Sequence, residues 1–427
     1  MRYFRYSAVL LTTLLSVSSA FAQTVLVTNA KIVTGSDQGI IENGYVLING
    51  ARIESVSVTD AALPQADEVI DAQGAWVTTG LMESASRVGL VEVEGGLEYR
   101  DYAVDKTTLG AGFRVDYAVN RFSSFLPMIR SQGITRAVLT PFADSSQFAG
   151  QAAVVDLAGK PDMVDINSAA VLVDLRESKL SINGGSHAKS VLDLLSALDA
   201  AKFYAKNKRA YETGKLKSLP IGEADLQALQ PVIDGETPLA LYINRAADIE
   251  NVLKALDPYK LRIILLGARE GWQVTEAIAS RDIPVILNGL DNLPDNFDTV
   301  GARLDNPALL AKAGIAVAFM SEDMFTDTKS LAQGAGTAVA YGMDWYQAIQ
   351  AITVVPASIW GIADTYGTLA SGKAADLLVW DGDPLEVTSK PTRIMINGEW
   401  LTTRTRQTEL RDRYRNLGAG TEPYGYR

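Results

Sequence analysis

The stretch PLALYINRAADIENVLKALDPYKLRIILLG, residues 238–267, contains two short apolar runs separated by a helical pattern. The runs Pro238–Asn244 and Leu261–Gly267 are almost continuously apolar, as parallel strands that are buried on both faces require. Between them, Ala246–Leu256 places apolar residues at helical spacing. This order predicts a strand–helix–strand unit that joins two parallel strands.

Similar units recur along the chain. Apolar runs cover Ile134–Pro141, Ile283–Gly289 and Gly314–Ser321, and helical patterns cover Val191–Tyr204, Gly271–Arg281 and Asn306–Ala313. Strand–helix alternation of this length fits a parallel barrel better than an all-β or an all-α fold. We therefore predict an α/β fold with a (β/α)8 TIM-like barrel over residues 79–365.

Both ends of the mature chain predict a second, all-β unit. Residues 24–78 alternate apolar and polar residues between Gly and Asn breaks. The runs Ala375–Pro384 and Arg393–Leu401 are similar, and the second contains an Asn-Gly turn. We predict a small β-sandwich built from residues 23–78 and 366–402, followed by a polar tail at residues 403–427.

The first residues predict export. Arg2 and Arg5 precede the apolar run Ala8–Val17, and Ala20-Phe21-Ala22 follows it, which is the pattern of a cleavable secretory signal. The apolar run is too short for a comfortable membrane span. We predict that the signal, residues 1–22, is removed, that no membrane anchor remains, and that the protein is periplasmic or secreted.

Composition excludes several kinds of site. The chain has no cysteine, which excludes thiol catalysis and zinc–thiolate sites, and His187 is its only histidine. A net charge of −11 argues against nucleic-acid binding. Ser186 and Ser190 flank His187 in sequence, but adjacency is not the geometry that a catalytic triad needs. We interpret His187 as a loop or capping residue.

Two phrases resemble the amidohydrolase superfamily, particularly its imidazolonepropionase-related branch. One is VLINGARIESV…VIDAQGAWVTTGLMES, within residues 46–84. The other, residues 351–401, includes Thr353, Pro356 and the motif GKAADL at residues 372–377. The resemblance implies a metal at the C-terminal ends of the barrel strands, and hydrolysis of C–N bonds in cyclic amides or small peptides by metal-activated water.

The same resemblance aligns the family's metal-binding histidines with residues that lack imidazole. The first-strand pair falls on Ala85 and Arg87, and a later motif shaped like HAHRADDI falls on YINRAADI, with Tyr242 and Asn244 at the histidine positions. Ala85 offers no donor atom, and Arg87 brings a permanent positive charge to the place of a dication. We therefore predict that the metal-ligand histidines are lost.

The family's acidic metal ligand falls on Glu322, with Asp323 as the alternative. One carboxylate cannot hold a catalytic divalent ion, so we predict no metal and no cofactor. The acidic segment Leu90–Asp105 is either a solvated loop, a binding rim at the barrel mouth, or part of a Ca²⁺ site. A Ca²⁺ site needs about six oxygen ligands, which the sequence does not place.

The residues therefore predict a metal-free pseudoenzyme that binds a small molecule in the barrel mouth, or a partner such as a homologous barrel or a second copy. The alternative is an active hydrolase of non-peptide C–N bonds. In that case Glu322 or Asp323 is the general base, and Arg87 polarises the carbonyl of a cyclic amide or peptide-like substrate. Arg245 and Glu270 are further predicted pocket residues, at the ends of predicted strands.

Overall fold

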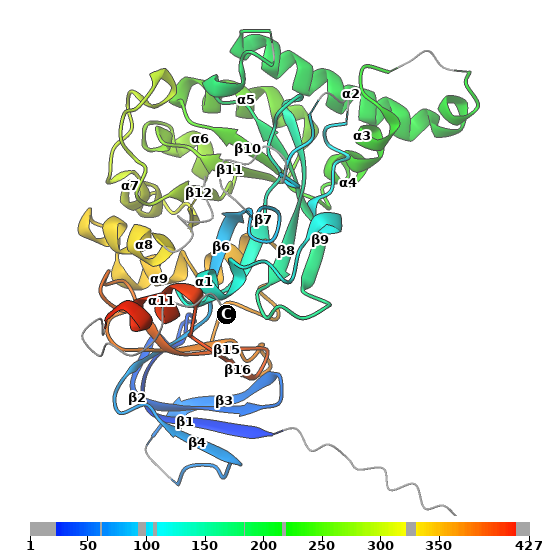
Figure 1. The fold of residues 1–427 in the computed structure, drawn as a ribbon. Helices are drawn as coiled ribbons and strands as arrows, with labels where there is room; N and C mark the ends of the chain where they lie inside the picture. Colours follow the sequence, from blue (N-terminus) through cyan, green and yellow to red (C-terminus); the bar gives the residue numbers. More distant parts are fainter. Residues whose placement is uncertain are drawn as a thin grey trace, which may run out of the picture.

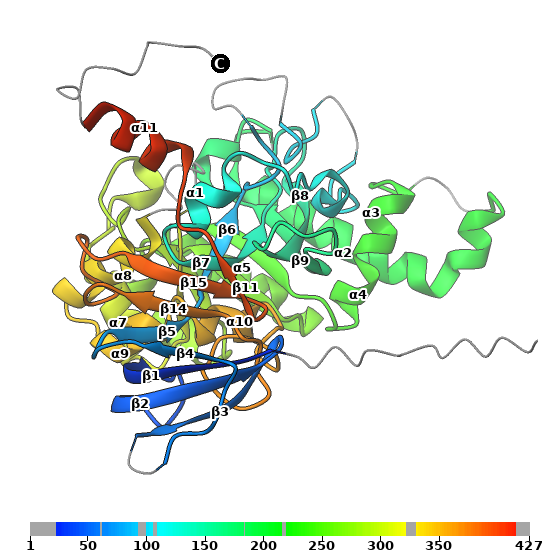
Figure 2. The same ribbon diagram turned by 60° about the horizontal axis from the view of Figure 1, so that its bottom comes forward.

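The computed structural model describes residues 23–59, 62–92, 100–105, 109–182, 184–215, 219–321 and 330–415. Two sheets of eight strands each organise these residues. One sheet curves into a barrel in the upper part of Figure 1, and the other lies below it, as Figure 2 also shows from the turned view. Within the described residues, no helix has the length and apolar character needed to cross a membrane.

The barrel sheet has the strand order β13-β12-β11-β10-β9-β8-β7-β6. Its strands are β6 (Leu81–Ser86), β7 (Ile134–Leu139), β8 (Phe148–Asp156), β9 (Val164–Asp174), β10 (Leu239–Ile243), β11 (Ile263–Gly267), β12 (Val285–Asn288) and β13 (Val317–Met320). The last strand, β13, lies beside the first, β6, so the barrel is nearly closed. The structure therefore confirms an α/β fold with a nearly closed, eight-stranded barrel.

Strand β8 departs from the predicted alternation of parallel strands and helices. It pairs antiparallel with both β7 and β9. The connections on its two sides, residues 140–147 and 157–163, contain no helix. A parallel neighbour needs a crossover of about a dozen residues or more, and these connections are too short for one.

Helices cover the outside of the barrel. The predicted helix Ala246–Leu256 is α5, with the same bounds, whereas α2 (His187–Glu212) is longer at both ends than the predicted segment. The remaining α-helices are α1 (Leu126–Arg130), α3 (Glu223–Ala228), α4 (Gln230–Ile233), α6 (Thr275–Ala279), α7 (Asn306–Lys312), α8 (Leu331–Ala340), α9 (Trp345–Gln350), α10 (Val354–Ile359) and α11 (Arg406–Arg415). Short 3-10 helices are η2 (Val115–Ala118), η3 (Glu177–Lys179), η4 (Asp257–Tyr259), η5 (Gly271–Gln273) and η6 (Phe297–Thr299).

The barrel strands are largely buried on both faces, which explains their nearly continuous apolar sequences, and the partly exposed first half of β9 is an exception. In β10, Leu241 and Ile243 pack in the large cluster that includes the covering helices. Tyr242, between them, packs in a separate cluster with Met82 and Ala85 of β6. Because successive side chains of a strand point to opposite faces, Tyr242 and Ala85 face the barrel interior and Ile243 faces the helices.

The second sheet contains strands from both ends of the chain, in the order β16-β15-β14-β5-β1-β2-β3, with β4 paired to β1. Its strands are β1 (Thr24–Val33), β2 (Ile40–Asn49), β3 (Arg52–Val58), β4 (Glu68–Asp71), β5 (Trp76–Thr79), β14 (Leu377–Trp380), β15 (Pro391–Ile396) and β16 (Glu399–Leu401). The predicted Asn-Gly turn is confirmed between β15 and β16. Asn397 and Gly398 have φ of 51° and 80°, the left-handed values that a two-residue hairpin turn requires.

Candidate functional site at the barrel mouth

We call the end of the barrel at the C-terminal ends of β6, β9, β10, β12 and β13 the barrel mouth. Arg87 follows β6 directly, and its Cζ lies 4.4 Å from the centroid of the Tyr102 ring and 5.0 Å from that of Phe142. The two rings meet edge to face, with centroids 6.3 Å apart. The guanidinium of Arg87 is therefore in contact with two aromatic rings, which attract a cation.

A second arginine occupies the adjacent part of the mouth. Asp174, the last residue of β9, accepts hydrogen bonds from Arg176 Nε at 3.0 Å and Arg176 Nη2 at 2.7 Å. The Cζ of Arg176 lies 4.5 Å from the ring centroid of Tyr242. Tyr242 therefore contributes the face of its ring to an arginine at this position.

Lys179 adds a third cation. It is 9% exposed, and its Nζ lies 3.6 Å from the ring centroid of Phe142. Burial lowers the pKa of Lys179, and the positive charges of Arg176 and Arg87 lower it further, against the opposing effect of Asp174. This part of the mouth is therefore a cluster of cations and aromatic rings.

Little space remains among these side chains. The cavity bounded by Arg87, Asp174, Arg176 and Tyr242 has a volume of about 10 Å³. A cavity needs roughly 10–15 Å³ to hold one water molecule. The cavity among these four side chains therefore has room for about one water molecule.

The other aligned positions also lack metal-binding nitrogen atoms. Ala85 is 3% exposed and packs inside the barrel. Asn244, just after β10, is 6% exposed, and its Oδ1 has no hydrogen-bond partner among the described residues. Glu322 and Asp323 lie outside the described residues.

Two predicted pocket residues lie away from this cluster. Glu270 accepts hydrogen bonds from the backbone N–H of Gly301 at 2.6 Å and of Ala246 at 3.0 Å, so its carboxylate binds the first residue of α5. Arg245 donates from Nη2 to Asp248 Oδ1 at 2.9 Å. Its side chain lines a separate cavity between α2 and α5, outside the strands.

Glu83, which no sequence motif indicates as a site residue, connects the first and last barrel strands. It lies in β6 and is fully buried. Its Oε1 accepts from Ser321 N at 3.0 Å and from Ala85 N at 3.1 Å, and its Oε2 accepts from Ser321 Oγ at 2.6 Å. Burial raises the pKa of Glu83 to about 7. The available signal was a carboxylate within the apolar strand sequence LMESAS.

Ser321 also borders an open part of the mouth. A cavity of about 260 Å³ lies beyond the ends of β12 and β13 and against α8. Its polar lining comes from Asn288, Asp291, Ser321 and Ser330. The mouth therefore combines a filled half beside β6, β9 and β10 with an open, polar half beside β12 and β13.

Comparison with known proteins agrees with this architecture. The sequence model of the amidohydrolase family matches residues 248–401. The chain is 20% identical over 395 residues to "Amidohydrolase tasK" of Hapsidospora irregularis, and the match covers 83% of this chain but only 39% of that protein. The chain thus spans about two fifths of the length of this relative.

Solved structures share the fold. An amidohydrolase from Thermotoga maritima MSB8 superposes with a TM-score of 0.80 at 21% identity, covering 89% of this chain and 100% of that one. A prolidase complexed with N-methylphosphonate-L-proline gives a TM-score of 0.56 at 15% identity, with coverage of 89% and 100%. Residues 248–401 thus match the amidohydrolase family, and these structures show that the chain shares the fold of amidohydrolases.

Proposed function

We propose that this protein is an exported pseudoenzyme of the imidazolonepropionase-related branch, whose barrel mouth is metal-free and binds a small molecule without hydrolysing it. The observation that carries the proposal is the position of Arg87, whose guanidinium contacts Tyr102 and Phe142 where the resemblance aligns a metal-binding histidine. We further propose that the sheet formed by both chain ends is a small β-sandwich domain, residues 23–78 and 366–402.

The side chains at the aligned positions do not fit a zinc-like ion. Such an ion prefers imidazole nitrogen, thiolate or carboxylate ligands. Ala85, Tyr242 and Asn244 provide a methyl group, an aromatic ring and an amide. The positive charges of Arg87 and Arg176 would also repel a dication, and burial weakens the screening of that repulsion by water.

The open half of the mouth is the better place for a ligand. Its volume of about 260 Å³ is slightly below the roughly 300–1,000 Å³ of most small-molecule sites. The polar groups of Asn288, Asp291 and Ser321 suit a small ligand with amide or hydroxyl groups. A homologous barrel or a second copy of the chain is the competing occupant.

Binding and turnover of the same compounds test this proposal. Cyclic amides and dipeptides are screened by thermal shift and, in parallel, for hydrolysis. We expect at least one compound to raise the melting temperature of the wild type without being hydrolysed. Ser330→Trp, which fills the cavity, should abolish that shift, whereas Ser280→Trp, on the exposed surface after α6, should keep it. Turnover by the wild type would contradict the pseudoenzyme.

The second candidate function is metal-independent hydrolysis of a cyclic amide or small peptide-like substrate. The observation that favours it is the hydrogen bond from Ser321 Oγ to Glu83, whose pKa of about 7 suits a general base at neutral pH. Turnover that is lost in Glu83→Gln and Ser321→Ala would support this dyad. Turnover that is lost only in Glu322→Gln and Arg87→Met would support the pair predicted from the sequence.

A further inference from the structure

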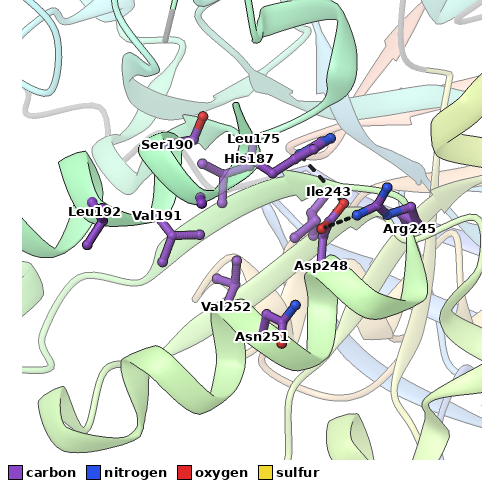
Figure 3. A pocket seen from close by; sticks show the side chains of 11 residues that line it. Leu175, His187, Ser190, Val191, Leu192, Ile243, Arg245, Asp248, Asn251 and Val252 are labelled. Carbon is purple, nitrogen blue, oxygen red and sulfur yellow. Dashed lines mark hydrogen bonds and ion pairs between the residues drawn. The ribbon is translucent and has the colours of Figure 1, made fainter. Parts of the chain in front are cut away.

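The only histidine of the chain lies beside two aspartates that come from other segments. His187 is the first residue of α2, Asp248 lies in the first turn of α5, and Asp298 lies in η6. Figure 3 shows the imidazole of His187 directed toward Asp248, which also binds Arg245. The sequence-based interpretation of His187 as a loop or capping residue is thus wrong about the loop, since the helix begins at this residue.

The separations among the three side chains are longer than hydrogen bonds. His187 Nδ1 lies 3.6 Å from Asp248 Oδ2, and His187 Nε2 lies 3.8 Å from Asp298 Oδ1. One ligand atom from each residue can be chosen so that all three lie within 4.8 Å of one another. Two ligands on the same zinc-like ion are roughly 3–3.5 Å apart, given metal–ligand bonds of about 2.0–2.2 Å. To bind one ion, the imidazole of His187 has to turn one nitrogen toward both carboxylates, and the three ligand atoms have to approach by about 1 Å.

The charges around the cluster favour a cation. Asp248 and Asp298 are 8% and 3% exposed. Burial raises the pKa of Asp298, and the negative charges of Glu177 and Asp248 raise it further, although the backbone N–H of Glu177 donates to this carboxylate. Among the described residues, Arg245, whose side chain is 43% exposed, forms an ion pair only with Asp248. The single guanidinium therefore leaves a surplus of negative charge that a divalent cation would balance.

The cluster borders a cavity with room for further ligands. This cavity, of about 520 Å³, is lined by His187, Arg245 and Asp248 at its polar end. Most of the remaining wall is apolar, with Leu175, Val191, Leu192, Ile243 and Val252 among its residues, and Ser190 and Asn251 add polar groups. Ile243 faces the covering helices, so the cavity is outside the barrel strands and distinct from the barrel mouth.

From this geometry we propose that His187, Asp248 and Asp298 bind one divalent transition-metal ion, such as Zn²⁺ or Mn²⁺, at the polar end of the cavity. One nitrogen and two carboxylate oxygens are a ligand set suited to these ions. Three protein ligands leave coordination positions open toward the cavity, for water or for the carboxylate or amide oxygen of a small molecule with an apolar body. This site goes beyond the proposed function, which concerns the barrel mouth.

The test is metal binding by chelator-treated full-length mature protein, titrated with Zn²⁺ or Mn²⁺ and measured by calorimetry and equilibrium dialysis. We expect one equivalent to bind to the wild type, and at least ten-fold weaker binding in Asp298→Asn and His187→Ala. Asp193→Asn, an exposed carboxylate on α2, is the matched control and should bind as the wild type does. Circular dichroism and melting temperatures establish that each variant is folded.

NMR spectroscopy shows directly whether the imidazole of His187 coordinates the metal. Because the chain has a single histidine, its imidazole NMR signals belong to His187 without ambiguity. Zn²⁺ should shift these signals and Mn²⁺ should broaden them, in the wild type and in Asp193→Asn. Unchanged imidazole signals with metal bound would overturn the proposal.

The variant Asp174→Asn separates this site from the barrel mouth. We expect it to bind metal as the wild type does. If Asp174→Asn abolished metal binding and Asp298→Asn retained it, the metal would lie at the barrel mouth. That result would overturn the site at His187, Asp248 and Asp298, and it would also contradict a metal-free mouth. If the wild type bound no metal, the proposed site at His187, Asp248 and Asp298 would be overturned, and the proposal for the barrel mouth would stand.

Discussion

Ser321 donates a 2.6 Å hydrogen bond from Oγ to the carboxylate of Glu83, and this contact joins the first barrel strand to the residue after the last one. The backbone N–H of Ser321 donates to the same carboxylate, at 3.0 Å. Since β6 and β13 are the terminal strands of the barrel sheet, Glu83 stabilises the place where the barrel closes.

The first prediction concerns the pH dependence of this contact. Folding raises the pKa of Glu83 from 4.5 to about 7, so the folded state favours the protonated carboxyl. Its contribution to the free energy of unfolding is complete below pH 4.5 and is lost as the pH rises toward 7. A shift of this size corresponds to about 3 kcal/mol. Urea unfolding between pH 4.5 and pH 8 should show this loss in the wild type.

Glu83→Gln keeps the shape of the side chain and, like the protonated carboxyl, has one acceptor oxygen and a donor group, but it cannot ionise. We expect it to remove most of that pH-dependent loss and to be more stable than the wild type at pH 8. Glu399→Gln is the control, because Glu399 forms an exposed pair with Lys160 and such pairs contribute about 0–1 kcal/mol. The same pH profile in wild type and Glu83→Gln would show that Glu83 is not the titrating group.

The second prediction concerns the cation cluster at the barrel mouth. Arg87→Met removes two cation–π contacts and should lower the free energy of unfolding by about 1–2 kcal/mol. It also removes a positive charge that lowers the pKa of Lys179, so that pKa should rise. Chemical denaturation checks the first effect, and NMR titration of the Lys179 side chain checks the second.

Arg121→Met is the matched control for this variant. Arg121 lies 3.8 Å from the ring centroid of Phe122, but that ring is 75% exposed, so its contact should contribute less, at most about 1 kcal/mol. The pKa of Lys179 should not change in this control. If both variants changed the free energy of unfolding and the pKa of Lys179 equally, the contacts of Arg87 at the barrel mouth would contribute no more than an exposed cation–π contact.

The fold was predictable where the sequence pattern is local. The helix Ala246–Leu256 has the same bounds in the structure, because its apolar face recurs at helical spacing. The antiparallel direction of β8 was not predictable in this way. Its sequence FAGQAAVVD is buried at every position, and an apolar run does not reveal the direction of the neighbouring strands.

The candidate sites were predictable only in part, because their contacts join distant segments. Arg87 was identified from the resemblance, but its aromatic partners Tyr102 and Phe142 lie in separate loops. The cluster of His187, Asp248 and Asp298 depends on how α2, α5 and η6 pack together, and no local spacing encodes that arrangement.

The third prediction concerns the contact between the barrel and the second sheet. Arg136 of β7 is 4% exposed, and its guanidinium lies within 3.5–3.7 Å of carboxylate oxygens of Asp156, Asp165 and Asp376. It also donates to the side chain of Asn397, in the β15–β16 turn, at 2.8 Å. Asp376 and Asn397 belong to the C-terminal part of the chain, so Arg136 connects the two sheets.

Arg136→Met should lower the free energy of unfolding by about 3–5 kcal/mol, because it leaves the carboxylates around it without their positive partner. Arg281→Met is the control: Arg281 pairs with Asp257 at the surface, where ion pairs contribute little to stability. Part of the loss in Arg136→Met should be recovered by adding Asp376→Asn, since that change removes a fully buried carboxylate. Urea unfolding of the three variants measures these differences, and a loss below about 1 kcal/mol in Arg136→Met would show that the carboxylates are not held in place by this arginine.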